Sequence, residues 1–477
     1  MSTRYRPWNP ITAARAKDLN TGEDTGNLYL RYAIDPKAEN AASQLEAVQR
    51  RHLSPMLQGH LDRWEMRAAH ELELMHAVGV RVDRVKAGKL VAALDGMVQE
   101  LERRLAEGAP GGKAANPKDR LIKPMDDDAV RWWLFAHKLP LNGPQAKMNE
   151  HLKAIEARHP IIPIIRRYRR LHSLNDAHPW LEDKSERIYP HHHHLCQATG
   201  RTTTVDPAAT GVPKEMRPII PATPGYELFE IDYRSMEVGV AAGRSGDARL
   251  TAAYRTGDAI GDIARIIFPE VLGNVTVADV KKLHKPLRDA AKPITYGTLY
   301  GQGPKGLADR TGKREAEAKA LQDRLFGTCT AFKAMVERTV QHLERTRTVI
   351  LDCGFERQVP AAEEDWRLRT IGANAPIQAA AGIIFRMASV LAGPRLRAIG
   401  ARLVLPIHDA YVCEAPEGRR ERAIAILGRA MEVASLVFFR GRLRLAVDVN
   451  DECATCWNKE GHGDSLELLI QDPAFRL

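Results

Sequence analysis

The stretch YELFEIDY (residues 226–233) decides the fold prediction, because its apolar and polar residues alternate and the run ends on an acid, Asp232. Alternation with a period of two predicts a half-buried β-strand. Residues 233–237 begin the next predicted helix, so the sheet would hold the Asp232 carboxylate at the edge of a cleft. An aspartate is also a common helix N-cap, and Asp232 alone therefore does not require chemistry.

A second acid, Asp409, has a similar setting. The stretch ARLVLPIHDAYVCEA (residues 401–415) predicts a β-hairpin with His408 and Asp409 at its turn. Taken alone, each acid is an ordinary turn aspartate. Two acids on neighbouring strands would repel each other at close range unless cations lay between them. Asp232 and Asp409 together therefore indicate a two-metal phosphoryl-transfer site.

Four residues of LRDAAKPITYGTLYG (residues 287–301) recur at intervals of four, namely Arg288, Lys292, Tyr296 and Tyr300. On a helix this spacing places all four side chains along one face. Two cations followed by two rings suit a nucleoside triphosphate, with the cations at the phosphates and a ring at the sugar and base. The alternative is a solvated basic face that ends in a buried aromatic pair, which explains the residue types but not the spacing.

The next residues, Gly301-Gln-Gly303-Pro-Lys-Gly306, match the pattern GxGxxG. A dinucleotide-binding loop of this pattern follows a strand within a βαβ unit, whereas this one follows a predicted helix. We therefore predict that it is the loop that ends the basic helix.

Helical patterns surround these segments. Residues 61–107 predict two long helices broken at 79–83, and residues 246–350 predict a helical region. The segments QATGRTTTV and MRPIIPA (residues 197–205 and 216–222) predict short β-rich pieces. After residue 354 the pattern predicts a helix, the hairpin, a second helix and a last strand (374–394, 401–415, 417–438 and LRLAVDV, 443–449). This order predicts an α+β fold in which a helical subdomain interrupts a catalytic sheet.

The amino-acid composition further narrows the classes of protein to which the chain could belong. The 477 residues are 44% apolar and 27% charged, which excludes fibrous and wholly disordered chains, and the formal charge of +10 weakly favours a polyanionic partner. We find no apolar run of about 18 residues and no signal core, so we expect a cytoplasmic protein without a membrane contact.

Cysteine and histidine give weak signals. The six cysteines are scattered, so a disulfide framework is not expected. Cys453 and Cys456, followed by His462, could form half a zinc site or a redox pair, although no second CxxC accompanies them. The run of residues 191–194 is all histidine, and we interpret it as a strand that crosses a polar groove.

Taken together, the motifs resemble the polymerase portion of the bacterial DNA polymerase I family (family A DNA polymerases), from about residue 60 to the C-terminus. Asp232-Tyr-Arg-Ser-Met-Glu237 resembles motif A, the Arg288 to Gly301 stretch motif B, and His408-Asp409 motif C. Ala198-Thr-Gly-Arg201 is similar to the primer-contacting stretch before motif A. Asn374-Ala-Pro-Ile-Gln378 is similar to the segment that follows the fingers.

This resemblance implies a right-hand polymerase fold, with a palm of antiparallel sheet and helical fingers and thumb. The expected parts, in chain order, are an N-terminal extension (1–60), the thumb (61–185), the first half of the palm (186–245), the fingers (246–350) and the second half of the palm (351–477). It also implies a monomeric, template-directed DNA polymerase of bacterial or phage origin. Such an enzyme adds deoxynucleoside triphosphates to the 3′-hydroxyl of a primer on a DNA template and releases pyrophosphate.

Site roles are implied in the same way. Asp232 and Asp409, helped by the Tyr233 carbonyl, would bind two Mg²⁺ ions, with Mn²⁺ as a substitute. Arg288 and Lys292 would hold the triphosphate, and Lys292 would protonate the leaving group. At the sugar of the nucleotide, Tyr296 would pack on the ring, and Tyr300 and Glu237 would exclude a ribose 2′-hydroxyl. At the primer-template DNA, minor-groove acceptors would be contacted by Arg201, Asn374 and Gln378. His408 would touch the primer end.

Several positions depart from the family pattern. Ala410 replaces the Glu that usually follows motif C, Ile260 replaces a triphosphate-contacting His, and Thr370 replaces an Arg. Tyr296 stands where many members have Phe, which implies weak discrimination against dideoxynucleotides.

Two alternatives to a DNA polymerase stay open, a DNA-binding relative that has lost catalysis and a single-subunit RNA polymerase.

The first 60 residues are too few for the family's proofreading domain of about 200 residues, and they lack the paired acids of its metal site. Residues 32–35 (YAID) faintly resemble the end of such a domain. We therefore expect no proofreading activity.

Overall fold

A computed structural model describes residues 46–47, 49–51, 53–107, 123–140, 148–175, 179–182, 184–209, 212, 214–351, 353–360, 363–450 and 453–458. Most of the predicted exonuclease remnant (residues 1–60), including residues 32–35, lies outside these residues, as does His462. The chain divides into two compact units. The first contains residues up to Gly79, residues 190–205 and residues 225–451. The second contains residues 80–189, 206–224 and those from 452 onward. The predicted domain boundaries stay predictions, and the helices before Gly79, which we assigned to the thumb, belong to the first unit.

The first unit is built on a four-stranded antiparallel sheet with the order β10-β5-β9-β8. Its strands are Val447–Asn450, Tyr226–Tyr233, Ala410–Pro416 and Arg402–Ile407. The predicted strand and hairpin are confirmed, and with them the α+β class. The last strand is shorter than predicted, because Leu443 and Leu445 are buried in the core before the strand begins.

Long helices cover this sheet. α20 (Asp365–Arg397) and α21 (Arg420–Phe438) pack against each other, and α5 (Met66–Val78) packs against α20 and β8. Among the described residues, α20 is the one helix long and apolar enough to cross a membrane, which corrects our prediction that no run reaches that length. Since 89% of its apolar window is buried inside the protein, α20 is explained as a core helix.

In the N-terminal part of the first unit, α4 (Pro55–His60) is followed by the π-helix η1 (Leu61–Glu65), which leads directly into α5. The histidine run forms β3 (His191–His193), which pairs with β4 (Thr203–Val205) as predicted for a strand. The segment between these strands includes Gly200 and Arg201.

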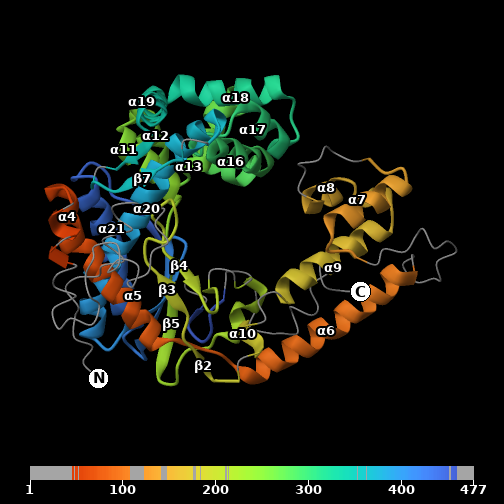
Figure 1. Cartoon of the computed structure of the whole chain (residues 1–477), viewed down its shortest axis with the longest axis horizontal. Helices are drawn as coiled ribbons and strands as arrows, with labels where there is room; N and C mark the ends of the chain where they lie inside the picture. Colours follow the sequence, from red (N-terminus) through yellow and green to blue (C-terminus); the bar gives the residue numbers. More distant parts are fainter. Residues whose placement is uncertain are drawn as a thin grey trace. The chain divides into compact units, whose positions relative to one another are not determined.

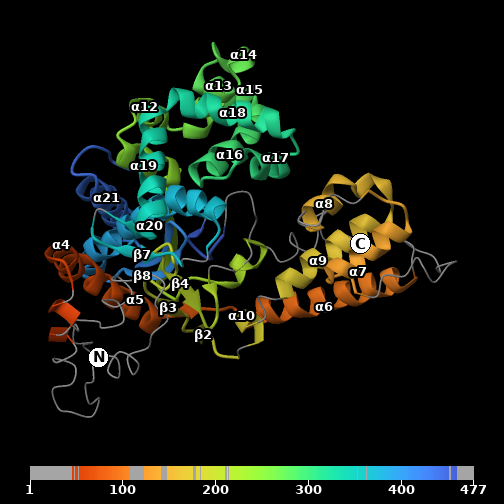
Figure 2. The ribbon, with the colours of Figure 1, turned by 45° about the horizontal axis from the view of Figure 1, so that its top comes forward.

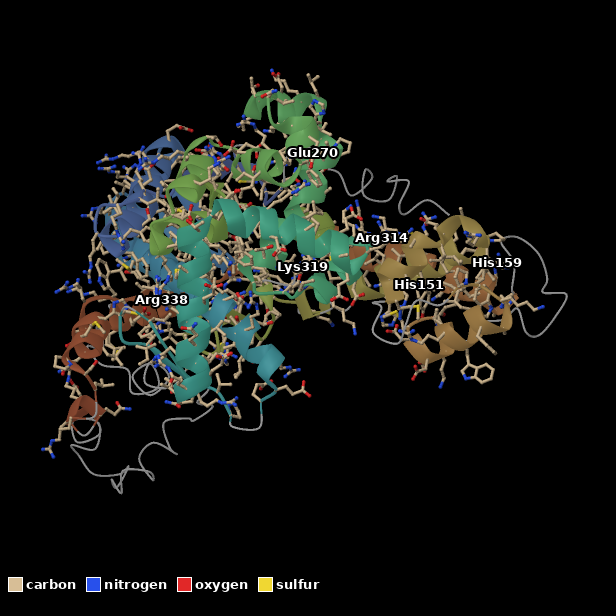
Figure 3. The ribbon with its side chains drawn as sticks, turned by 90° about the horizontal axis from the view of Figure 1, so that it is seen from above. His151, His159, Glu270, Arg314, Lys319 and Arg338 are labelled. Atoms are coloured by element: carbon tan, nitrogen blue, oxygen red, sulfur yellow. The ribbon has the colours of Figure 1, made fainter. Side chains whose placement is uncertain are left out.

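Residues 246–350 are helical, as predicted, up to a short strand pair (β6, Thr348–Ile350; β7, Glu356–Gln358). In both views α16, α17 and α18 lie together and away from the sheet (Figures 1 and 2). Arg314 is the N-cap residue of α18, Lys319 lies on α18, and Arg338 lies on α19 (Figure 3). α11 (Met236–Ser245) precedes this region, whose helices are α12 (Ala248–Arg255), α13 (Ala259–Ile267), α14 (Pro269–Leu272), α15 (Val277–Leu283), α16 (Lys285–Leu299), α17 (Pro304–Thr311), α18 (Glu315–Thr328) and α19 (Thr330–Thr346).

The second unit is mainly helical. Its helices are α6 (Arg84–Glu107), α7 (Asp127–Ala136), α8 (Met148–Ala154), η3 (Glu156–Arg158), α9 (Ile161–Asn175) and α10 (Pro179–Glu182). The predicted break at residues 79–83 is confirmed, since α5 ends at Val78 and a short strand, β1 (Val80–Arg81), precedes α6. β1 pairs with β2 (Arg187–Ile188).

One β-rich prediction in the second unit is wrong. Residues 214–219 form a 3₁₀ helix, η5 (Lys214–Ile219), that includes Pro218, and a proline cannot donate a hydrogen bond to a strand ladder. Only Pro221 makes an isolated bridge, to Cys456. Cys453 and Cys456 are both buried, and no cluster of three or more His, Cys, Asp or Glu suited to a metal occurs among the described residues.

Candidate active site

The two predicted acids lie together at one end of the sheet. Asp232 is near the end of β5, and Asp409 lies in the two-residue turn that joins β8 to β9. The Tyr233 amide donates to the Asp409 carbonyl oxygen at 3.2 Å, which ties the strand end to the turn. The Asp232 side chain lies close enough to Asp409 to act on its pKa, which it lowers. The turn itself needs an uncommon backbone conformation, since His408 has a φ of 54°.

Electrostatics at this end of the sheet disfavour a second negative charge. Burial, followed by the charge of the nearby Glu237 carboxylate, raises the pKa of Asp409 to about 6, while Arg201 acts in the opposite direction. Glu237 lies in the first turn of α11, directly after β5. Three carboxyl groups thus share a small region in which an added cation would be stabilising.

The basic stripe is a helix face, as the spacing predicts. Arg288, Lys292 and Tyr296 lie on α16, and Tyr300 is its C-cap residue. Burial, followed by the negative charges of Glu237, Asp409 and Asp232, raises the pKa of Tyr296 to about 12. The aromatic end of the stripe therefore lies near the acids, and the rings of Tyr296 and Tyr300 are 6.3 Å apart.

Both cations of the stripe have carboxylate partners in this structure. Arg288 donates to Asp258 from Nη2 at 2.8 Å and from Nε at 2.8 Å. Lys292 Nζ lies 2.8 Å from Asp289, one turn earlier on the same helix. Hydrogen bonding to Asp258 raises the pKa of Arg288, so this guanidinium stays charged.

Glu237 connects the helix to the loop before β4. Its Oε1 accepts a hydrogen bond from the Tyr300 hydroxyl at 3.0 Å, and Arg201 Nη2 lies 3.5 Å from the same oxygen. Burial and the Glu237 charge raise the pKa of Tyr300, which keeps its hydroxyl protonated as the donor. The structure thus brings Arg201, Glu237 and Tyr300 into one chain of contacts.

The other predicted residues lie on elements around this centre. Asn374 and Gln378 are half-buried and one turn apart on α20, so their side chains share a face. His408 is exposed beside Asp409. The loop after α16 confirms our interpretation of GxGxxG: Gly301 has a φ of 71°, and a Cβ there would lie 2.8 Å from the Arg369 carbonyl oxygen of α20.

The structure also shows where the residues that depart from the family pattern lie. Ala410 pairs directly with Asp232 across β5 and β9, so its buried methyl group occupies the position next to the acid. Ile260 is 4% exposed and belongs to the core. The Thr370 hydroxyl donates to the Gly301 carbonyl oxygen at 3.5 Å.

The sequence analysis did not predict a role for two acids that contact this region. Asp258 holds Arg288 from a position 30 residues earlier, and it also caps α13 by accepting from the Gly261 amide at 3.1 Å. Asp448 lies directly opposite Asp232 on β10 and forms an ion pair with Arg234. Asp258 stands just before an apolar helix and could have been predicted as an N-cap, but no local pattern pairs it with Arg288.

Comparisons with known proteins add a family match. A family model described as DNA polymerase family A matches residues 133–459. A thermostable DNA polymerase I of Thermus filiformis is 28% identical over 379 residues, covering 76% of this chain and 44% of the relative. A DNA polymerase I of Chloroflexus aurantiacus is 29% identical over 447 residues, covering 88% of this chain and 45% of the relative. The chain thus spans less than half the length of these relatives.

A solved structure shares the fold. The polymerase domain of M. smegmatis Pol1, solved in complex with a DNA primer-template and dNTP, superposes with a TM-score of 0.80 at 20% identity. The match covers 95% of this chain and 82% of that one. At this identity the likeness concerns the fold alone.

Proposed function

The chain belongs to DNA polymerase family A, and on that premise we propose that it is a template-directed DNA polymerase. It would add deoxynucleotides to the 3′-hydroxyl of a primer and release pyrophosphate. The observation that carries the proposal is the meeting of Asp232 and Asp409 at the sheet end, with the aromatic end of the α16 stripe beside them.

Two magnesium ions are the cofactor that this site would hold, with Mn²⁺ as a substitute. The donors fit, because carboxylate oxygens are preferred ligands of Mg²⁺, and a bound cation would offset the burial and the Glu237 charge that raise the pKa of Asp409. The described residues offer no cluster of three or more His, Cys, Asp or Glu side chains placed to hold one metal ion, so water and phosphate oxygens would have to supply the remaining ligands. When bound, the ions would supply activation of the primer hydroxyl and charge stabilisation at the phosphates.

The α16 residues would bind and orient the nucleotide. Arg288 would exchange Asp258 for phosphate oxygens, and Lys292, which is 45% exposed, would exchange Asp289. Lys292 would then hold a proton for the leaving pyrophosphate. Tyr296 would pack on the sugar, while the Tyr300 and Glu237 pair would fill the space that a 2′-hydroxyl requires.

Contacts with primer-template DNA would come from Arg201, Asn374, Gln378 and His408. The M. smegmatis polymerase domain was solved with a DNA primer-template and dNTP, and we extend both partners to this chain. We also propose that the protein acts as a monomer in the cytoplasm without a membrane partner.

Lack of proofreading is part of the proposal; residues 32–35, which faintly resemble the end of a proofreading domain, lie outside the described part of the chain. A primer with a mismatched 3′ end, incubated without nucleotides, should keep its length. Shortening of the primer by the pure protein would contradict this.

The direct test of the activity is extension of a labelled primer on a DNA template with Mg²⁺, with deoxynucleotides and ribonucleotides in parallel reactions. We expect extension with deoxynucleotides only. Extension with ribonucleotides would favour the RNA polymerase alternative. DNA binding without extension would favour a relative that has lost catalysis.

A further inference from the structure

A buried ion pair lies behind the candidate active site. Glu65, the last residue of η1, is 0% exposed, and Arg386 of α20 is 2% exposed. Arg386 Nε donates to Glu65 Oε2 at 2.7 Å, and its Nη2 donates to Oε1 at 3.2 Å. A two-pronged contact of this kind fixes the plane of the guanidinium.

Two histidines complete the surroundings of Glu65. His194 Nε2 lies 2.7 Å from Oε2, and His60 Nε2 lies 3.2 Å from Oε1. Burial would raise the pKa of Glu65, but the charge of Arg386 and the hydrogen bonds of both histidines hold that pKa well below its usual value. The Glu65 carboxylate is therefore ionised and has partners on both oxygens.

The third arm of Arg386 reaches the chain next to the site. Its Nη1 donates to the Gly200 carbonyl oxygen at 2.6 Å. Gly200 has a φ of 70°, and Gly382 of α20 leaves the required space, since a Cβ there would lie 3.0 Å from Nη1 and 3.1 Å from the Gly200 oxygen. The guanidinium thus bridges Glu65 to the residue that immediately precedes Arg201.

Arg201 points into the candidate site, where its Nη2 lies 3.5 Å from the Glu237 carboxylate. The peptide whose carbonyl Arg386 holds is the one that leads into Arg201, so its orientation sets the direction in which the Arg201 side chain leaves the backbone. We propose that Glu65 and Arg386 are positioning residues, which hold Gly200 so that Arg201 faces the primer terminus. This inference rests on the proposed function.

The chain supplies a control in a second Arg–Glu pair, whose arginine is 41% exposed. Arg397 of α20 donates to Glu71 of α5 at 2.6 and 2.9 Å, and Glu71 is buried. This second pair links α20 to the same N-terminal helical segment. Among the described residues, neither Glu71 nor Arg397 bonds to residues 198–201.

The experiment is a double-mutant cycle on primer extension. Arg386→Lys keeps a cation beside Glu65, but an ammonium lacks the planar fork that reaches both Glu65 and Gly200. We expect Arg386→Lys to lower kcat/KM for nucleotide addition by about ten-fold and Arg397→Lys by less than about two-fold. In an Arg201→Ala background, Arg386→Lys should cause no further loss, because its effect passes through Arg201.

The outcomes are separable. Equal losses from Arg386→Lys with and without Arg201, or no loss in a folded Arg386→Lys protein, would overturn the proposal. Circular dichroism and thermal unfolding check the fold, and Glu65→Gln, which keeps the side-chain size, replaces Arg386→Lys if that variant does not fold. If the wild type extends no primer, the proposed function fails instead, and the same cycle measured on the Kd for primer-template DNA then decides the positioning role.

Discussion

The acidic end of the sheet and the basic face of α16 belong to the same unit but balance their charges differently. On α16 each cation already has a carboxylate, Arg288 with Asp258 and Lys292 with Asp289. At the sheet end, Asp409 lies among other acids, and burial raises its pKa to about 6. A ligand at α16 would therefore exchange with an existing partner, whereas a cation from outside the chain would stabilise the sheet end.

The largest effect expected on the basic face comes from Lys292→Ala. If Lys292 protonates the leaving pyrophosphate, its loss should lower kcat by about 10³-fold with a smaller change in KM, since general acid catalysis contributes about 10²–10⁴-fold. Single-turnover kinetics with a saturating nucleotide would measure it. A change confined to KM would assign Lys292 to binding alone.

Arg288→Ala should have the next largest effect. Loss of a charge-assisted contact with phosphate is expected to cost about 2 kcal/mol and to raise the nucleotide KM by about 30-fold. Titration of the deoxynucleotide in steady-state extension checks this. An unchanged KM would mean that Arg288 stays with Asp258 throughout the reaction.

Asp409→Asn should stabilise the metal-free protein at neutral pH. The ordinary pKa is 3.8 and the folded value about 6, so the folded state binds the proton more tightly and loses stability as pH rises through this window. The variant should gain about 1 kcal/mol above pH 6, allowing for partial solvent screening, and nothing below pH 3.8. Denaturant unfolding in EDTA measures the gain; a variant less stable than the wild type at pH 8 would show that the acids are not crowded.

Asp258→Asn should have the smallest effect, in the opposite direction to Arg288→Ala. Asparagine can still cap α13, but it no longer neutralises Arg288. We expect the nucleotide KM to fall by about three-fold, because phosphate no longer competes with a carboxylate. A rise in KM would show instead that Asp258 orients Arg288 for binding.

Local patterns in the sequence predicted much of this structure. The strand at 226–233, the hairpin at 402–416 and the helix that carries Arg288 all follow from periodicity within one element. Predictions failed where tertiary packing decides. Leu443 and Leu445 fill the core rather than extend β10.

Long-range pairs explain what was missed in the candidate site. Asp258 and Arg288 are 30 residues apart, and Glu65 and Arg386 are 321 residues apart. No periodic pattern connects such positions. Only the folded chain shows that Arg386 also reaches the Gly200 carbonyl. The sequence predicted a role for Arg201, but it gave no sign of the residues that hold the peptide before Arg201 in place.

The measurement that most directly tests the role of the sheet end compares Asp409→Asn with the wild type in primer extension and in primer-template binding. The substitution keeps the size of the side chain and removes the charge that would hold a metal ion. We expect extension to fall by at least about 10³-fold while the Kd for DNA changes by less than about three-fold. Extension at the wild-type rate would contradict the assignment of this acid to the active site.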